Sequence, residues 1–102
     1  MLVQLTMFPT DKRGESVSAD VAKVIDIIDR SGLPYKLTAM STVIEGSWER
    51  VMAVINKARL MLKRRYSRVY IIITIDDRKG AKNRLSGKIK SVENKLNREV
   101  CK

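Results

Sequence analysis

The sequence predicts an α+β fold, and three observations lead to that prediction. Short segments whose apolar residues alternate with polar ones are typical of half-buried strands. Longer segments with apolar residues three and four positions apart are typical of amphipathic helices. The order along the chain is strand, helix, strand, strand, helix, strand and then an extra helix. At 102 residues the chain has the length of one domain, which we expect to span 1–102, with its core in 1–77 and a basic turn and helix in 78–102.

The first strand and the first helix form the beginning of the chain. The strand is predicted over Leu2 to Phe8, and Pro9 ends it because proline cannot donate to a sheet ladder. Either Ser16 or Ser18 can cap the start of the helix. The buried stripe of this helix is predicted from residues at helical spacing: Val21, Val24, Ile25 and Ile28. Gly32 suits the position just after the helix.

Two short strands, a second helix and a fourth strand follow. The two short strands are predicted over Tyr35 to Ala39 and over Thr42 to Glu45. Ser47 is the predicted cap of the second helix, whose buried stripe consists of Val51, Ile55, Ala58 and Leu62. The fourth strand, Val69 to Ile75, is β-branched almost throughout, and its inner face would carry Val69, Ile71, Ile73 and Ile75.

This order of elements predicts the ferredoxin-like βαββαβ arrangement. Right-handed crossovers then place both helices on one face of a four-stranded antiparallel sheet. The other face would carry polar and apolar side chains together: Gln4, Thr6, Thr38, Tyr70, Ile72 and Thr74. A face of that kind is too apolar for bare solvent and is usually covered by a second subunit. We therefore expect a second subunit to cover this face.

Composition excludes several classes of function. The chain has no histidine and one cysteine, Cys101, which excludes histidine-based catalytic triads, zinc sites and intramolecular disulfides, and no metal is expected. The longest apolar run, Val69 to Ile75, is far shorter than the roughly 20 residues of a membrane helix. The first residues lack the basic start of a signal peptide. We expect a cytoplasmic protein that does not contact a membrane.

The formal net charge of +10 is concentrated at the C-terminal end. Residues 78–102 carry nine basic and two acidic side chains, whereas residues 1–77 carry 12 basic and nine acidic ones. This asymmetry is consistent with nucleic-acid or phosphate binding, or simply with a solvated lysine-rich helix face. The predicted helix in this segment has a narrow apolar seam that consists of Leu85, Ile89, Val92, Leu96 and Val100.

Five motifs are distributed along nearly the whole chain. They are Ser-Val-Ser (16–18), Ser-Gly-Leu-Pro-Tyr (31–35), Met-Ser-Thr-Val-Ile-Glu-Gly-Ser-Trp (40–48), Ile-Asp-Asp-Arg (75–78) and Gly-Lys-Ile-Lys-Ser-Val (87–92). Together they resemble the small thiamine-binding protein family of the YkoF-like superfamily. The resemblance implies a cytoplasmic, ferredoxin-like protein that forms a homodimer, or commonly a homotetramer, through its sheets. It also implies binding of thiamine, or of its hydroxymethylpyrimidine moiety, without any transformation of the ligand.

Thiamine joins an aminopyrimidine to a cationic thiazolium ring, so its recognition needs a carboxylate or carbonyl, hydroxyls, and an aromatic face or negative charge. Glu45 is the candidate carboxylate, although an exposed charge on an edge strand would look the same in the sequence. Ser41 and Thr42 are candidate hydroxyl contacts, or they bond the local backbone. Trp48 is a candidate for stacking on a ring, or it is the outermost residue of the core.

Four further residues complete the predicted sites. Tyr70 is either a wall of the ligand site or a subunit contact. Asp76, at the end of the last strand, is a candidate contact for a cation, although with Asp77 it can instead form a salt-bridged turn. Ser16 and Ser18 lie at a helix start, where they are candidates for binding an anion or for plain helix capping.

Other functions remain open at this point. The charge of +10 repels a cation, so a thiamine site would need local acidic side chains or would serve a phosphorylated form. One alternative is a basic nucleic-acid-binding protein of the same fold, although the central strands lack the aromatic signature of RNA-recognition domains. Another is a structural or regulatory subunit that docks through the C-terminal seam. Enzymatic activity is not predicted, because no nucleophile with a base, phosphate loop or metal cluster is visible.

Overall fold

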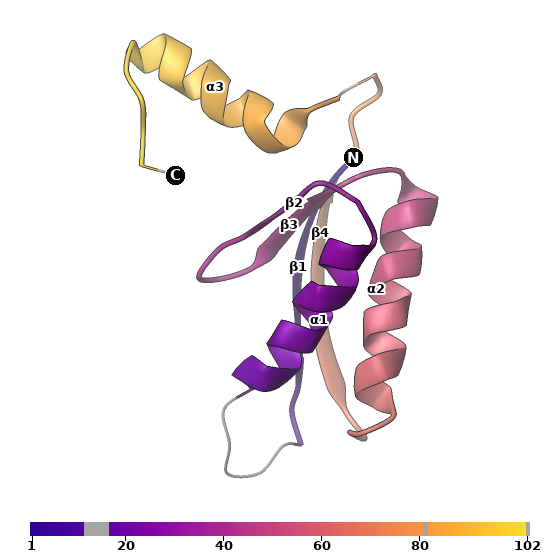
Figure 1. The fold of residues 1–102 in the computed structure, drawn as a ribbon. Helices are drawn as coiled ribbons and strands as arrows, with labels where there is room; N and C mark the ends of the chain where they lie inside the picture. Colours follow the sequence, from indigo (N-terminus) through magenta and orange to yellow (C-terminus); the bar gives the residue numbers. More distant parts are fainter. Residues whose placement is uncertain (12–16, 81, 102) are drawn as a thin grey trace.

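The computed structural model describes residues 1–11, 17–80 and 82–101, and it has the predicted α+β fold (Figure 1). The sheet has the order β2-β3-β1-β4, and all neighbouring strands are antiparallel. This is the ferredoxin-like topology, with an extra C-terminal helix. The elements are β1 (Leu2–Pro9), α1 (Ser18–Arg30), β2 (Tyr35–Leu37), β3 (Thr42–Glu45), α2 (Trp48–Lys63), β4 (Val69–Asp76) and α3 (Arg84–Leu96).

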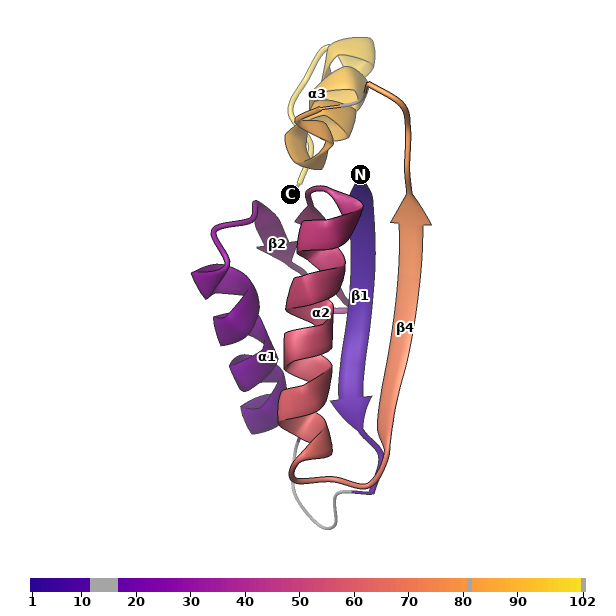
Figure 2. The ribbon, with the colours of Figure 1, turned by 90° about the vertical axis from the view of Figure 1, so that its right-hand side faces the viewer.

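The helices α1 and α2 cover one face of the sheet, and Figure 2 shows the opposite face without a covering layer. The core lies between the helices and the sheet because the predicted apolar stripes face each other there. Its buried residues include Val3, Leu5, Val24, Ile28, Ile44, Val51, Ile55, Ala58 and Leu62. The described residues contain no helix with both the length and the apolar character needed to cross a bilayer.

Local sequence signals account for most of the helix ends. The Ser47 hydroxyl accepts a hydrogen bond from the Arg50 N–H at 3.3 Å, which confirms the predicted cap of α2. Gly32 follows α1 with a φ of +78°, a conformation that glycine adopts without strain. The predicted cap at the start of α1 is wrong for Ser18, because that residue is already helical and Val17 occupies the cap position. Ser16 lies outside the described residues.

The prediction for the inner face of β4 is only half correct. Val69 and Ile71 pack against the core, but Ile73 is 37% exposed and Ile75 is 36% exposed. β4 is the edge strand, so its second half lies outside the layer that α1 and α2 form. The alternation in the sequence predicted which residues share a face, but it could not predict how far the helices extend over that face.

Two other elements end earlier than predicted. β2 stops at Leu37, because the next residues close a tight hairpin instead of continuing the strand. α3 stops at Leu96, where Asn97 has a φ of +60°, so Val100 lies beyond the helix and does not extend its apolar seam. Figures 1 and 2 show α3 beyond the end of the sheet and apart from α1 and α2.

Candidate ligand-binding pocket

A difference in strand length leaves one edge of β1 open. β1 has eight residues and β3 has four, and their pairing runs from Leu2 opposite Glu45 to Leu5 opposite Thr42. On its other side, β1 stays paired with β4 as far as Pro9. The second half of β1 therefore has a strand neighbour on one side only. A pocket lies on the other side.

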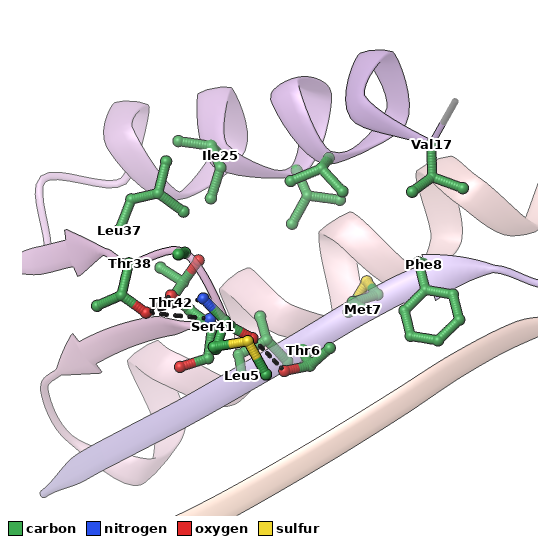
Figure 3. A pocket seen from close by; sticks show the side chains of 14 residues that line it. Leu5, Thr6, Met7, Phe8, Val17, Ile25, Leu37, Thr38, Ser41 and Thr42 are labelled. Atoms are coloured by element: carbon green, nitrogen blue, oxygen red, sulfur yellow. Dashed lines mark hydrogen bonds between the residues drawn. The ribbon is translucent and has the colours of Figure 1, made fainter. Parts of the chain in front are cut away.

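This pocket has a volume of about 180 Å³ and lies between α1, β1 and the hairpin that joins β2 to β3. Figure 3 shows α1 along one wall, β1 along the opposite wall and the hairpin at one end. Most of the lining is apolar and comes from β1, α1 and the hairpin: Leu5, Met7, Phe8, Val17, Val21, Val24, Ile25, Leu37, Ala39 and Met40. The other lining residues carry hydroxyls, namely Thr6, Thr38, Ser41 and Thr42.

The hairpin end of the pocket is held by its own hydrogen bonds. The Thr38 N–H donates to the Ser41 carbonyl at 2.8 Å, and the Thr38 hydroxyl accepts the Ser41 N–H at 3.1 Å. The amide of Gln4 on β1 donates to the Ser41 hydroxyl at 2.9 Å. The hairpin tip is thus tied both to itself and to the neighbouring strand, which makes it a fixed wall. The Ser41 hydroxyl is partly used in this contact.

Thr42 differs from the other hydroxyl residues. It is the first residue of β3, where it pairs with Leu5 of β1, it lines the pocket, and it is only 5% exposed. Among the described residues, its hydroxyl makes no hydrogen bond. A buried polar group normally has a hydrogen-bond partner, because burial without one costs free energy. Thr42 is therefore well suited to receive its partner from a bound molecule.

Among the residues that the structure describes, none that lines the pocket has an acidic or basic side chain. An ion inside would have to lose its hydration without a counter-charge, which is costly. The pocket therefore favours a neutral, largely apolar ring with a few polar atoms. The described part of the chain also contains no group of three or more His, Cys, Asp and Glu side chains that could hold a metal ion.

The predicted site residues fall into separate places in the structure. Ser41 and Thr42 are together in the pocket. Glu45 lies at the opposite end of β3, where its carboxylate accepts the backbone N–H groups of Arg84 at 2.8 Å and Leu85 at 3.3 Å. Those N–H groups belong to the first turn of α3, which otherwise lacks a side-chain cap. Glu45 thus acts as a cap for α3 from another element.

Asp76 takes part in the same attachment of α3. Its carboxylate accepts a hydrogen bond from the Arg84 guanidinium, and this contact raises the pKa of Arg84 above its usual range. The Arg84 side chain is mostly buried, while that of Asp76 is about half exposed. Glu45 and Asp76 therefore hold the start of α3, and the structure does not bring either of them to the pocket.

The aromatic and serine candidates also lie away from the pocket, or at its margin. Trp48, in the first turn of α2, is exposed. Tyr70 lies on the uncovered sheet face beside Phe8, with a ring-centre separation of 5.6 Å. Ser18 begins α1 next to Val17, which lines the pocket. Ser16 is not among the described residues, so its place relative to the pocket is not defined.

Sequence reasoning missed the apolar walls of the pocket. The residues Val21, Val24 and Ile25 of α1 were predicted only as a buried stripe, and Met7 only as a strand residue. One signal could have revealed them, because the predicted first strand is clearly longer than the third. An antiparallel partner that ends early must leave part of the longer strand without a neighbour.

The contact between Glu45 and α3 leads to a prediction. Glu45→Ala should free the first turn of α3 and weaken its attachment by about 1 kcal/mol, the usual cost of losing a helix cap. Hydrogen exchange of the amides in 84–96 should become faster. Glu49→Ala is the matched control, because it removes an exposed carboxylate from the first turn of α2. Unchanged exchange in α3 would show that Glu45 does not hold this helix.

The fold and the pocket together define a ferredoxin-like α+β protein with a neutral, hydroxyl-bearing pocket beside its first strand. The chain belongs to the thiamine-binding protein family, since the sequence model of that family matches residues 3–93. UPF0045 protein Mb1933 of Mycobacterium bovis is 40% identical over 84 residues, which are 81% of this chain and 82% of that protein. UPF0045 protein YqgV of Bacillus subtilis is 35% identical over 100 residues, which are 93% of this chain and 96% of that protein.

Solved structures show the same fold. Protein MJ1052 of Methanocaldococcus jannaschii superimposes with a TM-score of 0.80 at 28% identity, over 89% of this chain and 93% of that one. Protein TM0486 of Thermotoga maritima, provisionally assigned to thiamine biosynthesis or salvage, has a TM-score of 0.77. Its sequence identity is 20%, over 89% of this chain and 96% of that chain, so this similarity supports the fold alone.

Proposed function

We propose that this protein binds thiamine, or its hydroxymethylpyrimidine moiety, in the pocket between α1 and β1, and that it does so in the cytoplasm without transforming the ligand. The family supports the choice of ligand. The observation that carries the proposal is the Thr42 hydroxyl: the residue is 5% exposed and lines the pocket, and its hydroxyl makes no hydrogen bond to another described residue. A ligand with a hydrogen-bonding edge would supply that partner.

The size and charge of the pocket favour the pyrimidine end of the molecule. Sites that enclose a drug-sized ligand typically have about 300–1,000 Å³, and this pocket has about 180 Å³. It therefore suits one ring better than two. Because no described residue of the lining is a carboxylate, the thiazolium cation would find no counter-charge there. In this arrangement the aminopyrimidine is inside, the thiazolium of thiamine stays at the mouth, and the net charge of +10 has little effect on the buried ring.

The individual residues then take different roles. We assign Ser41 and Thr42 to ligand contacts, because both line the pocket. We assign Glu45 and Asp76 to the attachment of α3, because their carboxylates already accept hydrogen bonds there. We assign Tyr70 to a subunit contact on the uncovered sheet face, where it is exposed beside other large side chains.

Titration calorimetry tests the ligand and the pocket together. Hydroxymethylpyrimidine and thiamine should both bind the intact chain, and Thr42→Val should weaken both by about tenfold because a hydrogen bond is lost with little change of shape. The temperature of unfolding should change little. Thr10→Val, an exposed threonine outside the pocket, is the matched control. The absence of measurable heat with either compound at millimolar concentration would contradict the proposal.

We also propose that the protein assembles with copies of itself through the uncovered sheet face. This face exposes large apolar side chains such as Tyr70 and Ile72, close to the half-buried ring of Phe8. Exposed apolar surface of this kind is a common mark of an interface. Because the face lies opposite α1 and α2 (Figure 2), assembly there would leave the pocket beside α1 accessible.

A further inference from the structure

The backbone N–H and C=O groups of successive residues in β1 point alternately toward its two neighbouring strands, β4 and β3. The Thr10 N–H donates to the Arg68 carbonyl at 3.1 Å, in line with the register of β1 and β4. Even-numbered residues of β1 therefore direct their backbone groups toward β4, and odd-numbered residues direct theirs toward β3. The last odd-numbered residue with a partner in β3 is Leu5, opposite Thr42. The next one is Met7.

No strand stands opposite Met7, because β3 begins too late. In the same register Met7 would face Met40, but Met40 lies in the hairpin turn that the Thr38–Ser41 hydrogen bond closes. The Met40 carbonyl instead lies 3.5 Å from the Thr6 hydroxyl. The side chain of Met7 is buried in the core. Its backbone N–H and C=O are therefore the polar groups that Met7 turns toward the open side of β1, where the pocket lies.

We propose that the backbone of Met7 recognises the ligand, which takes the place of a strand partner beside β1 where β3 has not yet begun. The Met7 N–H donates to a ring nitrogen of the ligand, and the Met7 C=O accepts a hydrogen bond from an amino group on the adjacent ring carbon. This inference rests on the proposed function and specifies the class of ligand: a flat, neutral heteroaromatic ring whose amino group is next to a ring nitrogen. An aminopyrimidine has that edge, and a thiazolium ring does not.

This arrangement explains how a pocket whose described lining has no charged side chain can be selective. The paired N–H and C=O of one residue have a fixed spacing, because the backbone of β1 is held on its other side by β4. A ring that lacks the amino group would leave the Met7 C=O buried without a partner, which is costly. The Thr42 hydroxyl, from the neighbouring strand end, adds a contact at the side of the ring.

Amide hydrogen exchange by NMR on the nitrogen-15-labelled chain of 102 residues tests the inference. Without ligand, the Met7 amide should exchange faster than the Leu5 amide, which is paired with Thr42. Saturation with 4-amino-5-hydroxymethyl-2-methylpyrimidine should slow exchange at Met7 by about tenfold or more and leave Leu5 nearly unchanged. The analogue with a methyl group in place of the 4-amino group should bind about tenfold more weakly.

The outcomes separate this inference from the proposed function. If calorimetry shows that the pyrimidine binds but exchange and chemical shift at Met7 stay unchanged, the Met7 inference is overturned and the pocket assignment stands. Equal affinity for the amino and methyl compounds would also overturn it. If neither compound binds, both the inference and the proposed function fail.

Discussion

Val21→Phe should abolish binding of hydroxymethylpyrimidine and thiamine. Val21 is a half-buried residue of α1 that lines the pocket. A phenyl ring at this position would occupy much of the cavity of about 180 Å³ and exclude the pyrimidine. We expect the affinity to fall by about 100-fold or more, since steric exclusion removes all contacts of the ring at once.

The stability of this variant should be preserved or slightly increased. An apolar cavity costs stability because its lining lacks contact partners, and a ring that fills it restores those contacts. Calorimetry measures the affinity, and thermal unfolding measures the stability. Ala22→Phe is the control, because Ala22 is the neighbouring residue of α1 and is exposed outside the pocket. If Val21→Phe bound the pyrimidine as well as the unaltered chain does, the ligand site would have to be placed elsewhere.

Much of the fold could be predicted because its signals are local. Ser47 caps α2 and Gly32 ends α1 where their chemistry indicates, since capping and positive φ depend on a few neighbouring residues. The pairing of a long first strand with a short third strand was also implicit in the sequence. The position of the gap beside β1 could not be predicted, because it depends on which residues of the two strands pair. The pairing of Leu5 with Thr42, the first residue of β3, leaves Met7 without a partner in β3.

The candidate site could be predicted only in part, because some of its contacts join residues that are far apart in the sequence. Ser41 and Thr42, which the sequence motif singled out, do lie together at the hairpin end of the pocket, and their role as ligand contacts stays a prediction. The partner of Glu45 could not be found, because its carboxylate contacts Arg84, which lies 39 positions further along the chain. Hydrophobic periodicity contains no information on such a distant contact. The same limit explains why Ile73 was expected to be buried although it lies at the sheet edge.

Ile72→Lys should separate the assembled protein into single chains. Ile72 is 49% exposed on β4. Its neighbour Ile71 packs against the core, so by the alternation of a strand Ile72 lies on the opposite, uncovered face of the sheet. If two such faces pack together about a two-fold axis, the substitution places a positive charge on both sides of one interface. Desolvation and like-charge repulsion should then raise the dissociation constant by about 100-fold or more. Sedimentation velocity at micromolar concentration should show a change from an oligomer to a species of 11.6 kDa.

Leu60→Lys provides the matched control for that experiment. Leu60 is an exposed apolar residue of α2, so the same charge is added to the helical side of the molecule instead of the sheet side. This variant should remain assembled. Pyrimidine binding should be retained in both variants, because neither residue lines the pocket. If Ile72→Lys sediments like the unaltered chain while Leu60→Lys dissociates, the helices and not the open sheet face form the contact between subunits.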